Sequence, residues 1–117
     1  GKEFVFQELS KYLEVIDLLM EEIIKRGLSR QLIQTRITQS CIYAFLNLQL
    51  EEWQTESAEK YRKPTKLLLR GMFTKYRDIV YPPRSKEFAE IYNRERARLG
   101  AEFREYEKIE EYMAKEV

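Results

Sequence analysis

The sequence predicts an all-α protein, an antiparallel (up-down-up-down) four-helix bundle with a long fourth helix. Apolar residues recur at spacings of three and four along four stretches, which is typical of amphipathic helices. The connections between these stretches are short, and short connections favour antiparallel neighbours. Only four glycines and three prolines leave little room for strands and their turns. We expect residues 1–117 to form a single helical-bundle domain around one core.

The longest apolar stretch, from Leu28 to Trp53, is expected to form the centre of that core. Ser29 is an N-cap candidate, because its hydroxyl can accept from the free N–H groups of a first helical turn. We expect this central helix to continue to about Glu59. Its apolar face is carried by Ile33, Ile37, Cys41, Ala44 and Leu48, and Phe45 and Leu46 widen it.

The first helix is expected from Glu3 to Arg26, because Gly27 directly follows two basic residues, a typical helix stop. A proline disfavours helix in the residue before it, so Pro64 predicts a break. The third helix then runs from about Thr65 to Tyr81. The buried face expected for the first helix consists of Val5, Leu9, Tyr12, Ile16, Leu19 and Ile23, with Leu13, Met20 and Ile24 at its border.

The fourth helix is expected to start after Ser85, a second N-cap candidate, and to continue to about Ala114. A break at Gly100 is the alternative. A helix of this length overhangs the third one, and exposed apolar surface on an overhang is typical of an interface. We therefore predict a homo-oligomer or a partner protein, with these interface candidates: Tyr92, Leu99, Phe103, Tyr106, Ile109, Tyr112 and Met113.

Composition argues against several classes of function. The chain has no histidine, the commonest general base and metal ligand, and no glycine-rich phosphate loop. Cys41 is the only cysteine, which rules out an intrachain disulfide and favours the cytoplasm. We expect Cys41 to be buried and unreactive. No apolar run reaches the ~20 residues of a membrane span. We predict no catalytic residue, metal, cofactor or small-molecule substrate, and no membrane association.

The net charge of +1 hides an uneven distribution. Residues 1–24 carry six acidic and two basic residues, whereas residues 25–101 carry sixteen basic and eight acidic ones. Basic residues interleaved with aromatic ones suit nucleic acid, because cations neutralise phosphates and rings stack on unpaired bases. The candidates for nucleic-acid binding (DNA or RNA) are Arg26, Arg30, Lys60, Arg62, Lys63, Lys66, Arg70, Lys75, Arg77 and Arg84.

Simpler interpretations compete with a nucleic-acid site. Surface lysines and arginines commonly serve only to solvate a bundle, and Phe73 and Tyr76 lie on the apolar stripe of the third helix. A helix-turn-helix does not fit residues 27–45, because Leu32, Ile33 and Ile37 stand where a recognition helix needs polar side chains. Any binding would therefore be phosphate-driven and non-specific.

The leading hypothesis is a non-enzymatic structural, assembly or adaptor protein that acts through helix–helix protein interactions. The alternative is a nucleic-acid-associated protein of packaging or coat type, which binds phosphates through the central basic segment. A small helical enzyme is a third possibility, and it requires a buried polar pocket. The many Glu, Lys, Arg, Tyr and Ile residues and the scarcity of Asn are a thermophile-like composition.

Overall fold

The computed structural model describes residues 2–100, 109 and 111 of the chain. Within these residues the fold has four α-helices and no strand, which confirms the all-α prediction. The helices are α1 (Lys2–Lys25), α2 (Arg30–Gln49), α3 (Glu56–Lys75) and α4 (Lys86–Leu99), and a short 3₁₀ helix, η1 (Glu51–Gln54), lies between α2 and α3. Over this part of the chain, no helix has the length and apolar character needed to cross a membrane.

The centre of the core is α2, as the sequence predicts. It packs against each of the other three α-helices, and it is buried on several sides rather than on one stripe. Ile37, Ile42, Phe45 and Leu46 are all fully inaccessible to solvent although they point in different directions around the helix. Helix α2 is therefore the element against which the other α-helices pack.

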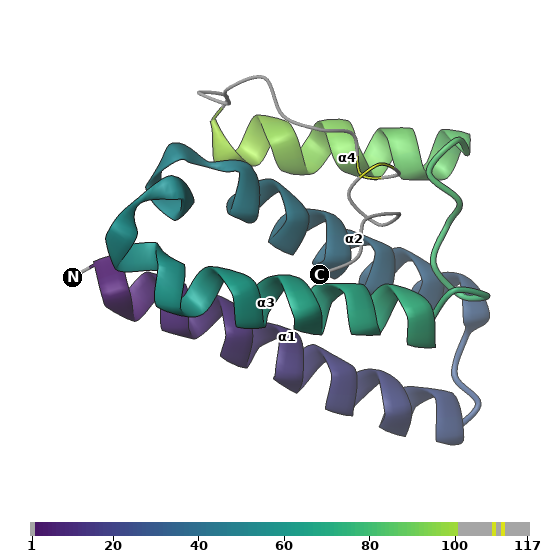
Figure 1. The fold of residues 1–117 in the computed structure, drawn as a ribbon. Helices are drawn as coiled ribbons and strands as arrows, with labels where there is room; N and C mark the ends of the chain where they lie inside the picture. Colours follow the sequence, from purple (N-terminus) through teal and green to yellow (C-terminus); the bar gives the residue numbers. More distant parts are fainter. Residues whose placement is uncertain (1, 101–108, 110, 112–117) are drawn as a thin grey trace.

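The other helices are arranged unequally around α2. Helix α1 packs against both α2 and α3, whereas α4 packs mainly against α2. Figure 1 shows the α1–α2 and α3–α4 connections at one end of the molecule and the α2–α3 connection at the other. In the described residues these packing contacts are consistent with a bundle in which α1 and α4 lie on different sides of α2.

The prediction that the central helix continues to Glu59 is wrong. Helix α2 ends at Gln49, and Leu50 has extended backbone (φ −67°, ψ 148°). The chain turns here because Trp53 reaches the core, where its ring lies 4.6 Å from that of Phe6 and only 1% of the residue is exposed. Gln54 Nε2 stabilises the turn by donating a hydrogen bond to the Leu48 carbonyl at 2.8 Å.

The predicted break at Pro64 is also wrong, since this proline lies inside α3. A proline cannot donate to the carbonyl four residues before it, which destabilises a helix by about 3 kcal/mol. Here Pro64 lies on the exposed side, where water can bind that carbonyl. Next to it, buried Thr65 shares a 2.6 Å hydrogen bond with Ser10 of α1 and holds this turn against the body.

Two helix ends follow the sequence signals closely. Gly27 takes the left-handed conformation (φ +67°) directly after α1, and its N–H bonds to the Ile24 carbonyl at 3.1 Å. Ser85 caps α4, since its Oγ accepts from the Phe88 N–H at 3.2 Å. Ser29 precedes α2 as predicted, but its side chain makes no capping bond.

Helix α4 is short where a long helix was predicted. It has 14 residues and ends at Leu99, because Gly100 takes φ +66° and ψ 130°, which no α-helix accommodates. The alternative prediction, a break at Gly100, therefore matches the structure. The predicted extension to Ala114 falls on residues 101–108, 110 and 112–117, which lie outside the described residues.

The buried face of α1 differs from the predicted one. Its core residues are Phe6, Leu9, Leu13, Ile16 and Met20, whereas Val5 and Leu19, predicted to be buried, are about half exposed (51% and 49%). Helix α1 carries more apolar residues than one face can bury. The sequence pattern therefore fitted two overlapping faces, and the structure uses the one that includes Phe6 and Leu13.

Candidate functional site

The most prominent surface feature is an exposed apolar face on α1 and the start of α2. Of the nine exposed large apolar side chains in the described residues, eight lie between Phe4 and Leu32. In Figure 1, α1 runs along the lower edge of the molecule and no labelled helix lies below it. We define the α1 face as Phe4, Val5, Val15, Leu18 and Leu19, continued by Leu28 and Leu32.

The side chains of this face are largely exposed among the described residues. Leu18 is 64% exposed and Leu32 is 63% exposed, so neither side chain contributes much to the core. Scattered single apolar residues are normal on a surface, whereas a contiguous patch marks a contact site. The α1 face is thus surface available for binding another apolar surface.

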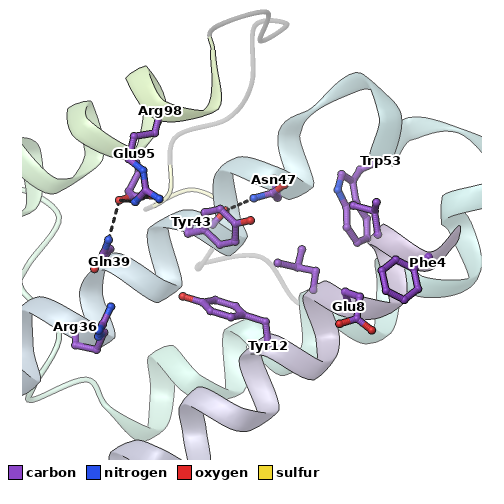
Figure 2. A pocket seen from close by; sticks show the side chains of 12 residues that line it. Phe4, Glu8, Tyr12, Arg36, Gln39, Tyr43, Asn47, Trp53, Glu95 and Arg98 are labelled. Carbon is purple, nitrogen blue, oxygen red and sulfur yellow. Dashed lines mark hydrogen bonds and ion pairs between the residues drawn. The ribbon is translucent and has the colours of Figure 1, made fainter. Parts of the chain in front are cut away.

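A hollow of about 520 Å³ lies beside the α1 face, between α1, α2 and α4. Figure 2 shows its apolar end formed by Phe4 and Trp53, and its polar end formed by Gln39, Glu95 and Arg98. The complete lining in the described residues is Phe4, Val5, Glu8, Leu9, Tyr12, Arg36, Gln39, Tyr43, Asn47, Trp53, Glu95 and Arg98.

The polar end of the hollow is built around Glu95, a carboxylate on α4 that is 1% exposed. Its Oε1 accepts from Gln39 Nε2 of α2 and from Arg98 Nη1, both at 3.0 Å. A buried charge must be paired and hydrogen-bonded, and here both partners are in place. Glu95 therefore ties α4 to α2.

Two tyrosines face each other in the middle of the hollow. The Tyr12 and Tyr43 rings are 5.4 Å apart in an edge-to-face arrangement, and the Tyr12 hydroxyl donates to Ser40 Oγ at 3.0 Å. Burial raises the pKa of Tyr12 above the ordinary tyrosine value.

A second polar cluster joins α1 to α3. Lys75 Nζ bonds to Asp17 at 3.0 Å and also to Glu21, and the Tyr76 hydroxyl donates to the Asp17 carbonyl oxygen at 3.0 Å and to its carboxylate. The bonds to Glu21 and Asp17 raise the pKa of Lys75. Burial, and then the bond to Asp17, raises the pKa of Tyr76. The charge of Lys75, a predicted phosphate contact, is thus neutralised by carboxylates of α1.

Several other predicted phosphate contacts are engaged within the chain. Arg26 pairs with Glu22 at 3.6 Å, and Arg30 Nη2 donates to the Asp78 carbonyl at 2.8 Å. Arg62 donates to the carbonyls of Trp53 and Thr55 and thereby closes the η1 turn. The Lys60 ammonium lies 5.4 Å from the Tyr61 ring.

The remaining predicted cations fall into two groups. Lys63, Lys66 and Arg70 are spaced by three and four residues, so they lie on one stripe of α3. Arg77 and Arg84 are exposed in the segment between α3 and α4, where Arg77 lines a second hollow of about 500 Å³. Phe73 packs against the core and Tyr76 is buried in it, as expected from their place on the apolar stripe of the third helix.

The predicted interface residues that the structure describes pack within the chain. Tyr92 stacks on Phe88 with 6.2 Å between ring centroids, and Leu99 packs against the core. Ile109 is 5% exposed and belongs to the core itself. Phe103, Tyr106, Tyr112 and Met113 lie outside the described residues, so the predicted interface on the fourth helix stays a prediction.

Sequence reasoning missed the α1 face: it assigned Val5 and Leu19 to the core and gave no role to Phe4, Val15 and Leu18. One signal was present: α1 has apolar residues on more than half of its circumference, a surplus for a helix that packs on one side. The burial of Cys41 was predicted correctly, and this burial raises the pKa of its thiol to about 12. In the described residues no cluster of acidic or cysteine side chains is arranged to hold a metal ion.

Comparisons of the chain with protein families, with curated proteins and with solved structures found no match.

Proposed function

We propose that this chain is a non-enzymatic assembly or adaptor protein that acts in the cytoplasm through helix–helix contacts, with the α1 face as its docking surface. The proposal includes the antiparallel up-down-up-down course of the helices, which leaves α1 at the edge of the bundle. The observation that carries it is the clustering of exposed apolar side chains between Phe4 and Leu32. Such a cluster gains stability when a partner covers it.

The exposed apolar side chains of this face can contribute free energy to association. Full burial of a leucine or valine side chain stabilises by about 1.5–3 kcal/mol. Val15, Leu18 and Leu19 are between 49% and 64% exposed, so roughly half of that gain is still available at each residue. Several such residues supply the buried centre that a specific interface needs.

The test is the mass of the protein in solution, measured by light scattering for the wild type and for Leu18→Glu. The substitution places a charge in the middle of the face and should abolish association, while circular dichroism stays unchanged. The matched control is Leu67→Glu on α3, an exposed leucine (49%) outside the face, which should leave the mass unchanged. An associated state that Leu18→Glu does not weaken would contradict the proposal.

A second candidate function is non-specific binding to nucleic acid through α3. It is supported by the stripe formed by Lys63, Lys66 and Arg70, since cations on one side of a helix can follow a phosphate backbone. Binding of this kind weakens steeply as salt increases. Binding of a DNA duplex at low salt that is lost at high salt would support this function, and no binding at low salt would exclude it.

A further inference from the structure

A single stripe of α1 carries charged and apolar side chains in a regular order. Its residues alternate at spacings of four and three, the spacing that keeps side chains on one side of a helix. The stripe lies on the side of α1 opposite to the buried residues Leu13, Ile16 and Met20, whereas Asp17 and Glu21 lie on the flank that faces α3. The α1 stripe consists of Phe4, Glu8, Lys11, Val15, Leu18, Glu22 and Lys25, all exposed or partly exposed.

The order of these side chains is self-complementary when the helix is reversed. Along the stripe, after Phe4, the chain presents acid, base, two apolar residues, acid and base. If two α1 helices lie antiparallel with Val15 against Leu18 of the second copy, Lys11 comes against its Glu22. In the same register Glu8 comes against Lys25 of the second copy. Both charge pairs are then attractive, and each occurs twice.

A parallel arrangement gives the opposite result. Equivalent residues would meet, so Glu8 would face Glu8, Lys11 would face Lys11 and Glu22 would face Glu22. Like charges in contact across an interface destabilise the wrong arrangement and thereby select against it. The macrodipoles of two helices also favour the antiparallel arrangement.

We propose that the α1 stripe binds a second copy of the chain, with the two α1 helices antiparallel about a two-fold axis that passes between Val15 and Leu18. This rests on the proposed function, because it names the partner of the same docking surface. Two-fold dimers are the commonest symmetric assemblies, and each copy uses the same surface. The apolar pairs occupy the centre and the charged pairs the rim, which is the usual anatomy of an interface.

The dimensions of the helix are adequate for such an interface. Helix α1 has 24 residues and is therefore about 36 Å long. The stripe from Phe4 to Lys25 extends over nearly the whole of this length.

The intrachain ion pairs along the stripe do not compete strongly with this contact. Lys11 lies 3.6 Å from Glu8, and Arg26 lies 3.6 Å from Glu22, with side chains between 45% and 74% exposed. Exposed pairs at this distance stabilise weakly. In the dimer the same carboxylates and ammonium groups gain partners on both chains, so the charges form a network across the interface.

Charge reversal tests the register. Lys11→Glu sets a carboxylate against Glu22 of the second copy, and Glu22→Lys sets an ammonium against Lys11, so each should weaken dimerisation by about tenfold or more. The double variant Lys11→Glu/Glu22→Lys restores the attraction and should return the dimerisation constant towards the wild-type value. The dimerisation constants of the wild type and the three variants are measured by sedimentation velocity at low salt. Lys86→Glu on α4, which reverses a lysine outside the stripe whose side chain is 85% exposed, against 58% for Lys11, is the control and should have no effect.

Three outcomes of these experiments distinguish a failure of this inference from a failure of the proposed function. If Leu18→Glu abolishes the dimer but the double variant does not recover from the single ones, the antiparallel register is wrong while docking through α1 stands. If the wild type sediments as a monomer over the full range of concentrations, a second copy is not the partner. If a dimer forms that Leu18→Glu does not weaken, the α1 face itself is not the docking surface.

Discussion

Replacing Trp53 by alanine tests the explanation of why the central helix ends at Gln49. Trp53 is the only tryptophan of the chain, is 1% exposed and makes an edge-to-face contact with Phe6 of α1. Had α2 continued through this residue, the indole would project from a helix that leaves the core. In the structure the turn at Leu50 directs it into the core, so its removal opens a large cavity.

The magnitude follows from burial. Truncating a fully buried tryptophan to alanine destabilises by about 3–5 kcal/mol. The free energy of unfolding of a small domain is about 5–15 kcal/mol, so Trp53→Ala removes about a fifth or more of it. At about 4–8 °C for each kcal/mol, the melting temperature should fall by roughly 20 °C. Trp53→Phe keeps an aromatic ring beside Phe6 and should lower the unfolding free energy by less than half as much.

The assay is urea unfolding followed by circular dichroism at the helix band, because the variant has no tryptophan fluorescence. Comparison of the two variants separates the loss of the ring from the loss of any large side chain. A loss of less than about 1 kcal/mol for Trp53→Ala, the value typical of a surface site, would refute the reasoning. It would mean that the indole does not hold the η1 turn against α1.

Two further predictions concern ionisable groups. Lys75 and Tyr76 both have a raised pKa in the folded protein. The stability that they contribute is therefore fully present below their ordinary pKa values of 10.5 and 10.0. This stability is lost as the pH rises through their pKa values in the folded protein. The urea concentration at the midpoint of unfolding should therefore decrease above about pH 10, and it should decrease less in Tyr76→Phe. The same dependence of the midpoint on pH in both proteins would contradict the role of this cluster. If α3 binds DNA, Arg70→Glu should weaken low-salt binding in a fluorescence anisotropy titration and reduce its salt dependence, whereas equal binding by both proteins would exclude the α3 stripe.

The features that the sequence predicted well are those set by local chemistry. Gly27 ends α1 and Ser85 caps α4 because a positive φ and a capping hydroxyl depend only on neighbouring residues. The central position of α2 follows from the length of its apolar stretch, and the burial of Cys41 follows from its place on that helix.

The features that the sequence did not predict depend on tertiary contacts. The α2–η1 turn exists because Trp53 packs against Phe6. This contact joins residues that are far apart in the chain, so it leaves no local signal in the sequence. The rule that proline breaks a helix fails at Pro64, because packing of the adjacent Thr65 overrides the local preference.

The candidate site was hidden for a related reason. Val5 and Leu19 fit a helical stripe as well as the true core residues do, and only the position of α2 and α3 decides which stripe is buried. The proposed function rests on the surplus apolar stripe, whose side chains are largely exposed. Predicted cations such as Arg62 and Lys75 proved instead to bind their own chain.

The central claim is that the α1 face holds two copies of the chain together, and the most direct test is disulfide trapping across the proposed axis. Chains carrying Val15→Cys and chains carrying Leu18→Cys would be mixed and oxidised, with the native Cys41 too buried to react. The account predicts that the mixed dimer, one chain of each kind, is the main cross-linked product. Cross-linking no greater than for a pair of cysteines placed at Leu67 would contradict it.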